Sequence, residues 1–362
     1  MTETLKDTIH LNSIRNILII RFSAMGDIIL ITPLLRWMKQ RFTNASLDVL
    51  VKPEYAVLLE NNPAVGHVLT LPENRRLTTL SGLRTEIQDR HYDAVVDLQA
   101  NWISRWLTWS SGAKRKAYYT PARWARFWLV HFGWNFYHQI EPVPLRYLRS
   151  VASWGVEDDG HGAELCSGNL DAEDLKKISA ALNPDKMIVI APGAGRRTKR
   201  WPAAFYRDAA KQCLNRGFSV VLVGGEGDRK LCGEIAQPLQ NGLLNLCGDL
   251  GLMETAALLK QSCVLLSNDT GVMHMAGAVG TPVIAVFGPT TEHLGFFPFR
   301  SNSIVIEHPH LSCRPCSFHG TERCPKKHFR CMREIKPDQV MEAMDLILTD
   351  SEGHRDTAWK GA

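Results

Sequence analysis

The fold is decided by Asn16-Ile17-Leu18-Ile19-Ile20-Arg21, which is followed by Gly26-Asp27 and a helical pattern from Ile28 to Arg41. A short apolar run rich in β-branched residues predicts a buried strand, and helical spacing directly after it predicts a βα unit. Because the strand is apolar on both faces, it is typical of a parallel sheet covered by helices on both sides.

The same alternation of strand and helix continues along the chain. Further strands are predicted over residues 47–51, 68–71, 94–98, 187–190, 219–223, 264–267 and 282–287, and further helices over residues 203–215 and 254–261. This pattern predicts an α/β protein with two Rossmann-like, doubly wound domains whose ligand loops face a central cleft. We expect an N-terminal Rossmann-like domain over 1–165, a C-terminal Rossmann-like domain over 180–335, and a helix and tail over 336–362.

Composition agrees with two globular domains. The chain has 362 residues, of which 45% are hydrophobic and 22% charged, a balance typical of packed globular proteins. It contains no uncharged apolar run of about 18 residues, the length that a transmembrane helix needs. Residues Met1 to Ser13 lack the apolar core of a signal peptide, so we expect a cytoplasmic protein.

Asp27 allows two interpretations. It follows the first strand and lies at the start of the first helix, where aspartate is a preferred capping residue. A carboxylate at that edge of a parallel sheet can also act as a general base. Gly26 before it permits a tight turn and the close approach of a ligand.

A basic loop follows the strand at residues 187–190. It reads Pro192-Gly193-Ala194-Gly195-Arg196-Arg197-Thr198-Lys199-Arg200-Trp201-Pro202. Glycines let backbone N–H groups approach a phosphate and cations neutralise its charge, although a solvated basic loop is the simpler interpretation. Thr198 stands where the dinucleotide fingerprint has its third glycine, so that fingerprint is incomplete.

A third polar segment, Ser267-Asn268-Asp269-Thr270-Gly271-Val272-Met273-His274, joins a strand to a helix. Asn268 or Thr270 could simply cap that helix. Alternatively, Asp269 and His274 beside a helix N-terminus would suit a sugar diphosphate, because the helix end attracts anions and carboxylates bind sugar hydroxyls.

Four motifs stand in order at the strand ends: Ser23-Ala24-Met25-Gly26-Asp27, Thr198-Lys199-Arg200-Trp201-Pro202, Asn268-Asp269-Thr270-Gly271-x-x-His274 and Val286-Phe287-Gly288-Pro289-Thr290. Together they resemble glycosyltransferase family 9, the ADP-heptose:lipopolysaccharide heptosyltransferases, over nearly the whole chain. The resemblance implies a GT-B fold, transfer of heptose from ADP-heptose with inversion to the lipopolysaccharide inner core, and no cofactor for the chemistry. It also implies that the domain over 1–165 binds the acceptor and the domain over 180–335 binds the ADP-sugar. The pattern is most similar to members that add the second heptose.

The resemblance also implies roles for single residues. Asp27 corresponds to the catalytic base that takes the proton of the acceptor hydroxyl. Lys199 corresponds to a contact to the donor phosphates and Asp269 to the carboxylate that holds heptose hydroxyls. With the loop residues above, the expected donor site is Gly193, Thr198, Lys199, Asp269, Thr270, Gly271 and His274.

The segment from Gln99 to Ile140 contains no Asp or Glu and holds six of the ten tryptophans. Its expected acceptor- or membrane-facing cations are Arg105, Lys114, Arg115, Lys116, Arg123 and Arg126. Cations among tryptophans suit an anionic membrane surface or a phosphorylated lipid, although several of the tryptophans could simply be core residues. We expect a phosphorylated lipid A–core acceptor, peripheral attachment to the inner face of the inner membrane, and no nucleic acid.

Four of the nine cysteines cluster late in the chain, as Cys313-x2-Cys316-x7-Cys324-x6-Cys331. Four thiolates at such spacing can hold a structural Zn or Fe ion. Reduced structural thiols and disulfides remain open alternatives.

Three other functions compete with the favoured one. The same fold could glycosylate a protein or another surface glycan, or it could serve as a non-catalytic nucleotide-binding module. A nicotinamide-dependent oxidoreductase is a weaker alternative, because Gly224-Gly225-x-Gly227 is a short match to the dinucleotide fingerprint.

Overall fold

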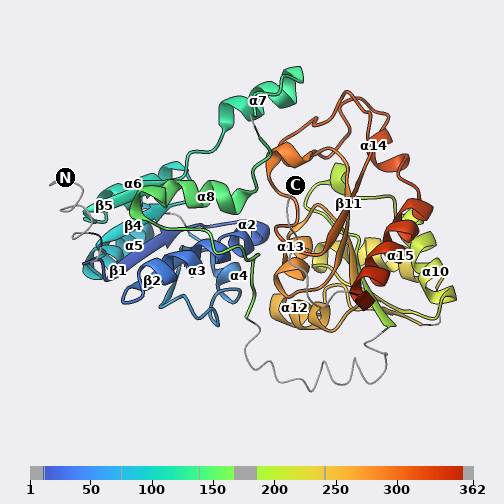
Figure 1. Ribbon diagram of the computed structural model, residues 1–362, viewed down its shortest axis with the longest axis horizontal. Coiled ribbons are helices and arrows are strands. Elements are labelled where there is room, and N and C mark those ends of the chain that lie inside the picture. Colours follow the sequence, from blue (N-terminus) through green and yellow to red (C-terminus); the bar gives the residue numbers. More distant parts are fainter. Residues whose placement is uncertain are drawn as a thin grey trace. The chain divides into compact units, whose positions relative to one another are not determined.

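The computed structural model describes residue 11 and residues 13–74, 76–137, 139–166, 186–239 and 242–353. The chain forms two compact units, of which unit 1 comprises Met1–Pro121 and Val143–Cys166 and unit 2 comprises Ala122–Pro142 and Ser167–Ala362. Each unit is built on a sheet of parallel strands joined by helices (Figure 1). The predicted α/β architecture with two doubly wound sheets is therefore confirmed.

Unit 1 has the strand order β3-β2-β1-β4-β5. The strands are β1 (Asn16–Ile20), β2 (Ser46–Val51), β3 (Val68–Thr70), β4 (Ala94–Asp97) and β5 (Arg115–Tyr118). The helices are α2 (Met25–Leu30), α3 (Thr32–Arg41), α4 (Pro53–Ala56), α5 (Leu77–Asp89), α6 (Trp102–Ser110), α8 (Val143–Val151) and the 3-10 helix η1 (Ala152–Trp154). Residues Ile17 to Ile20 of the central strand are completely buried, as a strand covered on both faces requires.

The first helical pattern is interrupted once. The sequence predicts a continuous helix from Ile28 to Arg41, but the structure has α2 and α3 with Ile31 between them. Pro33 explains the break, because it has no N–H and its ring crowds the carbonyl of Ile29, four residues earlier. The Thr32 hydroxyl donates to that same Ile29 carbonyl at 2.8 Å.

Unit 2 has the strand order β11-β10-β9-β6-β7-β8. The strands are β6 (Met187–Ala191), β7 (Ser219–Leu222), β8 (Leu243–Asn245), β9 (Val264–Asn268), β10 (Val283–Phe287) and β11 (Ser303–Glu307). The helices are α7 (Arg123–Phe132), α10 (Ala203–Asn215), α11 (Arg229–Ala236), α12 (Leu252–Lys260), α13 (Gly271–Ala278), α14 (Arg330–Arg333) and α15 (Pro337–Gly353), with the 3-10 helices η3 (Arg197–Lys199), η4 (Glu226–Asp228) and η5 (Glu292–Leu294).

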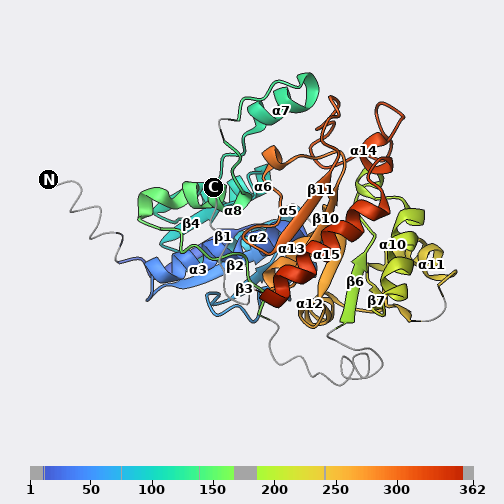
Figure 2. The same cartoon turned by 45° about the vertical axis from the view of Figure 1, so that its right-hand side comes forward.

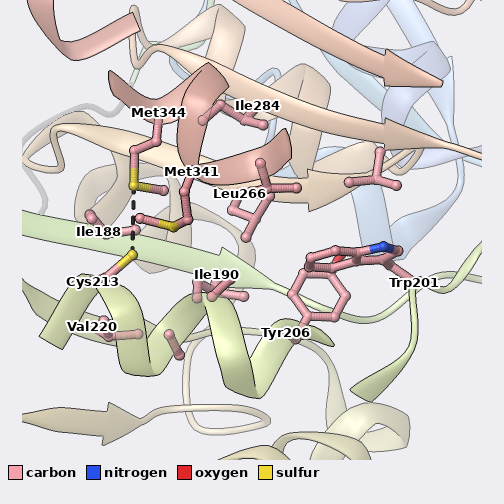
Figure 3. Packing of buried hydrophobic residues seen from close by; sticks show 14 of the residues in the cluster. Ile188, Ile190, Trp201, Tyr206, Cys213, Val220, Leu266, Ile284, Met341 and Met344 are labelled. Atoms are coloured by element: carbon pink, nitrogen blue, oxygen red, sulfur yellow. Dashed lines mark hydrogen bonds between the residues drawn. The ribbon is translucent and has the colours of Figure 1, made fainter. Parts of the chain in front are cut away.

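The core of unit 2 joins its sheet to its last helix. α15 packs against α10, β10 and β11 (Figure 2). Met341 and Met344 of α15 lie in one buried cluster with Ile188 and Ile190 of β6, and the Cys213 thiol lies 3.6 Å from the Met344 sulfur (Figure 3). The predicted helix over residues 203–215 is confirmed as α10.

The strand orders place the ligand-binding edges. In unit 1 the order reverses between β1 and β4, and in unit 2 it reverses between β6 and β9. Ligands of open parallel sheets bind outside the carboxyl ends of the strands at such a reversal. The segments that follow these four strands are therefore the candidate site. Among the residues that the structure describes, no helix is both long and apolar enough to cross a membrane.

Candidate functional site

Asp27 lies at the reversal point of unit 1, in the first turn of α2. Its Oδ2 accepts a hydrogen bond from the N–H of Ala24, the residue before the helix, at 3.2 Å. Asp27 therefore has a capping role at the start of α2, and its second oxygen is left for other partners.

That second oxygen faces a cation and a hydroxyl. Arg21 approaches Asp27 Oδ1 at 2.6 Å, with side chains only 12% and 16% exposed respectively. The Tyr147 hydroxyl lies 3.3 Å from the same oxygen. Burial acts to lower the pKa of Arg21, but Tyr147 and Asp27 more than offset this and raise it above its ordinary value. Burial raises the pKa of Tyr147 well above its ordinary value, so the phenol stays neutral.

The loop after β4 binds the residues that follow β1 and so helps to hold this site. The Gln99 side-chain oxygen accepts from the N–H of Phe22 at 2.9 Å, and the Leu98 carbonyl accepts from Arg21 at 2.7 Å. Asp97 is fully buried and accepts from the N–H groups of Gln99 and Ala100, both at 3.0 Å. Asp97 and Leu98 end the predicted strand at residues 94–98 and Gln99 follows it, so their place at the carboxyl end of a strand was a usable signal that the four motifs do not include.

In unit 2, the structure brings Lys199 and Asp269 together at the reversal point. Lys199 Nζ lies 2.7 Å from Asp269 Oδ2, with side chains 16% and 8% exposed. The Thr290 hydroxyl donates to the same oxygen at 2.7 Å. A fixed ammonium beside a fixed carboxylate, both open to a little solvent, suits a ligand that carries phosphate and hydroxyl groups.

Asn268 joins the loops that hold this pair. Its side-chain oxygen accepts from the Trp201 N–H at 3.0 Å, and its amide nitrogen donates to the Pro192 carbonyl at 2.9 Å. Trp201 is buried and its indole donates to the Ile335 carbonyl at 3.0 Å. The basic loop is therefore pinned to the end of β9 on one side and to the core on the other.

The remaining predicted donor residues lie at the same edge with more local contacts. A Cβ on Gly193 would come within 2.2 Å of the Asp228 carboxylate, so that side chain packs closely against the glycine. The Thr198 hydroxyl bonds Thr321, and the Thr270 hydroxyl bonds Ser267 at 3.2 Å. Gly271 begins α13, and His274 is a buried residue of its first turns.

Four of the six tryptophans of the basic segment are exposed, whereas Trp106 packs against the core of unit 1. Trp102, Trp109, Trp124 and Trp134 are 68%, 74%, 61% and 57% exposed, and Trp106 and Trp128 are partly buried. Because α7 and the residues after it also expose Phe127, Phe132 and Phe136, this part of the segment presents an apolar surface.

The cations of this segment differ in their partners. Arg105 pairs with the buried Asp97 at 3.3 Å and lies over the Tyr118 ring, so it stabilises unit 1. Lys116 donates to the Trp109 carbonyl at 3.1 Å, and Arg126 lies over the Phe318 ring. Lys114 and Arg123 are exposed, and Arg115 lies on the edge strand β5.

The four clustered cysteines are not arranged as the predicted metal site. They are thiols without disulfides, and within the described ranges no three His, Cys, Asp or Glu side chains form a group that could hold a metal ion. Burial raises the pKa of the Cys331 thiol to about 12 and also raises that of Cys316. Because the described residues form no such group, we route no step through a Zn or Fe ion.

Comparisons with known proteins agree with this geometry. Residues 81–328 match the model of glycosyltransferase family 9 (heptosyltransferase). The chain is 30% identical to lipooligosaccharide heptosyltransferase 2 of Campylobacter jejuni over 176 residues, which cover 47% of this chain and 53%, about half, of that relative. It is 25% identical to lipopolysaccharide heptosyltransferase 2 of Escherichia coli over 93% of this chain and 99% of the relative.

A solved structure shows the same fold. The structure of E. coli ADP-heptose LPS heptosyltransferase II superposes with a TM-score of 0.72 and 22% identity, covering 93% of this chain and 99% of the other. That fold is GT-B, which consists of two Rossmann-like domains. The two parallel sheets described above, one in each unit, agree with it. The chain therefore belongs to glycosyltransferase family 9, the heptosyltransferase family.

Proposed function

We propose that this enzyme transfers heptose from ADP-heptose, with inversion, to the inner core of lipopolysaccharide, and that it adds the second heptose. The observation that carries the proposal is the pair of Lys199 and Asp269, 2.7 Å apart at the reversal point of unit 2. The names of the relatives support the donor, since the two curated relatives are called heptosyltransferases and the solved one is named for ADP-heptose.

The donor chemistry follows from the charges of this pair. Lys199 supplies a cation to the diphosphate, and the N-terminal N–H groups of α13, which begins at Gly271, lie beside Asp269 in sequence and favour an anion. Asp269, held by Thr290, accepts hydrogen bonds from the sugar hydroxyls. When a diphosphate arrives, Lys199 exchanges part of its contact with Asp269 for contact with the phosphate.

The reaction is a single displacement. The acceptor hydroxyl oxygen attacks the anomeric carbon of heptose as the bond from that carbon to the phosphate oxygen breaks. Asp27 takes the hydroxyl proton, and ADP leaves with the bonding electron pair, its charge stabilised by Lys199. One displacement inverts the anomeric configuration, and no metal or covalent sugar intermediate is needed.

The acceptor is a phosphorylated lipid, and we place the enzyme at the inner face of the inner membrane. The segment from residue 99 to 140 supports this, because it carries no acidic residue and exposes aromatic side chains. Aromatic rings and cations together are the features by which peripheral proteins bind anionic bilayers.

The test is a transfer assay with ADP-heptose and a truncated core lipid that carries one heptose, read by mass spectrometry. We expect the lipid to gain one heptose, and Asp27→Asn to abolish this gain while ADP binding is kept, because asparagine can still accept the Ala24 N–H but cannot take a proton. Glu60→Gln, at an exposed acidic residue of unit 1, is the matched control and should retain activity.

Other outcomes discriminate between the competing functions. Transfer to a protein or another glycan, with none to the lipid, would keep the donor chemistry and reject the acceptor. Binding of NAD in preference to ADP would reject the transferase. ADP binding without release of ADP from ADP-heptose, whatever the acceptor, would indicate a non-catalytic module.

A further inference from the structure

The cysteine loop, defined here as Cys313–Cys331, has no part in the reaction proposed above, yet its middle lies against the donor lysine. The Thr321 carbonyl accepts from the Thr198 N–H at 3.0 Å and from the Thr198 hydroxyl at 2.8 Å. The Thr321 N–H donates to that hydroxyl at 2.7 Å. Because Thr198 immediately precedes Lys199, these three bonds fix the backbone from which the Lys199 side chain extends.

Gly320 tightens the contact. It has a positive φ of +81°, and a Cβ built on it would lie 2.8 Å from Lys199 Cγ and 2.9 Å from Arg196 Cβ. Both atoms are close to the backbone, so they cannot swing aside as the tip of a side chain can. The cysteine loop therefore touches the base of the Lys199 side chain with almost no space between them.

The start of the same loop holds the partner of Lys199. The Arg314 guanidinium, only 6% exposed, pairs with Glu307 at 2.7 Å. It also donates to the Thr290 carbonyl at 2.8 Å. Since the Thr290 hydroxyl binds Asp269, one loop reaches both members of the Lys199–Asp269 pair.

A third contact joins the loop to α7. The Phe318 ring lies 4.6 Å below the Arg126 guanidinium and 5.9 Å from the His131 ring. Phe318 is two residues from Gly320, and Arg126 and His131 lie on the helix that exposes Trp124 and Phe132. Packing of α7 on Phe318 therefore restrains the part of the loop that touches Lys199.

We propose that the cysteine loop is the positioning element of the donor site: Gly320 and Thr321 fix Lys199, Arg314 fixes the Thr290 that holds Asp269, and α7 braces the loop through Phe318. The proposal concerns positioning residues, since none of these groups touches the reacting atoms. Its value for catalysis rests on the donor site proposed above, but the placement of Lys199 can be measured without any substrate.

The decisive variant is Gly320→Ala, and its control is Gly217→Ala. Both glycines have a positive φ, +81° and +82°, but a Cβ on Gly217 meets nothing within 4 Å. Both substitutions thus carry the same backbone strain, and only Gly320→Ala displaces the donor loop. In the ligand-free protein, labelling with an amine-reactive reagent and peptide mass spectrometry report the reactivity of Lys199 relative to the exposed Lys230.

We expect Gly320→Ala to label Lys199 several-fold faster than wild type, because displacing the loop loosens the pair with Asp269, whereas Gly217→Ala labels as wild type. ADP affinity, measured by calorimetry, should fall by about tenfold in Gly320→Ala, which corresponds to about 1.4 kcal/mol. In the transfer assay, KM for the donor should rise while kcat at saturating donor and KM for the acceptor stay unchanged. Wild-type labelling of Lys199 in Gly320→Ala would overturn the proposal.

The contact between α7 and Phe318 is tested by Phe318→Ala and Phe318→Leu. The first removes the ring that Arg126 and His131 contact, and the second restores part of its volume. We expect faster Lys199 labelling in Phe318→Ala and partial recovery in Phe318→Leu. Equal labelling in Phe318→Ala and wild type would remove α7 from the proposal. If the variants change Lys199 labelling as expected but the wild-type protein does not bind ADP, the proposed function is refuted and the positioning role still holds.

Discussion

At the scale of single residues, Asp27 combines a local and a long-range role. Its Oδ2 caps α2 through Ala24, and its Oδ1 faces Arg21 and Tyr147. Tyr55 of α4 also interacts electrostatically with Asp27. Both oxygens of the carboxylate are thus engaged, which fixes its position at the start of α2.

Arg21 should matter through the contact that holds the Asp27 carboxylate in place. Arg21→Gln removes the cation that lies 2.6 Å from Asp27 Oδ1, and we expect kcat to fall by about tenfold because the carboxylate is no longer held in one position. Tyr147→Phe removes only the hydroxyl at 3.3 Å and should lower kcat by less. Steady-state kinetics at saturating donor and acceptor check this, and a wild-type kcat in Arg21→Gln would contradict the positioning role of Arg21.

Lys199 should dominate the affinity for ADP. Removing its ammonium in Lys199→Ala takes away a charged partner of the diphosphate, and we expect ADP affinity to fall by about 10- to 100-fold. Arg216→Ala removes a surface cation of the same unit that pairs with Asp345 at 2.6 Å, and it should leave ADP affinity unchanged. Calorimetric titration of both variants makes the comparison, and equal losses would point to a general effect of net charge.

The residues of the candidate site were predictable where they lie inside a motif. Asp27, Lys199 and Asp269 stand in the segments that follow predicted strands, and the structure brings Lys199 and Asp269 together. Their partners could not be predicted, because Tyr147 lies 120 residues from Asp27 and Thr290 lies 21 residues from Asp269. Only the folded sheets place such residues beside each other, and the catalytic roles themselves stay predictions.

At the scale of secondary-structure elements, burial decided what could be predicted. The buried central strands β1, β4, β6, β9 and β10 were found within a residue or so of their ends, since their apolar runs are continuous. The strands β5, β8 and β11 were missed, and each lies at the edge of its sheet. An edge strand is only partly covered, so polar residues such as Arg115 and Lys116 obscure its pattern.

A salt bridge ties α3 to the segment that closes unit 1. Arg36 donates two hydrogen bonds to Asp159, at 2.6 and 3.0 Å. Burial works against ionisation of Asp159, but hydrogen bonds from Arg36, Trp37 and the His161 N–H more than offset it and hold its pKa well below the usual range.

This pair should make stability depend on pH. Because the pKa of Asp159 is lower in the folded than in the unfolded chain, its contribution is present above the unfolded value of about 3.9 and is lost as the pH falls below that. At pH 7, Asp159→Asn should cost about 1–3 kcal/mol. Urea denaturation at pH 7 and pH 3 checks this, with exposed Glu157→Gln as control, and a cost that is equal at both pH values would contradict the assignment.

At the scale of the whole molecule, binding to a membrane should depend on α7 and the residues after it. Trp124→Ala combined with Trp134→Ala removes two rings that are 61% and 57% exposed, and it should lower co-sedimentation with anionic vesicles. Leu77→Ala removes a side chain that is 82% exposed on α5 and should have no effect. Equal binding to neutral and anionic vesicles would argue against the role of the cations.

The division of the chain into units could be predicted only in outline. Two sets of βα elements predict two sheets, but no local pattern shows that residues 122–142 group with unit 2 while the residues on either side group with unit 1. That grouping depends on tertiary contacts such as those of Arg126 and His131 with Phe318.

The chain thus enters unit 2 at Ala122, returns to unit 1 at Val143 and leaves it for good after Cys166. A gene cut at that last crossing would yield two pieces that do not correspond to the two folded halves. The later piece would lack residues 122–142, which pack on Phe318. The earlier piece would contain those residues without Phe318 to pack on. Anyone who wishes to recombine halves between relatives should therefore exchange residues 122–142 together with the C-terminal half.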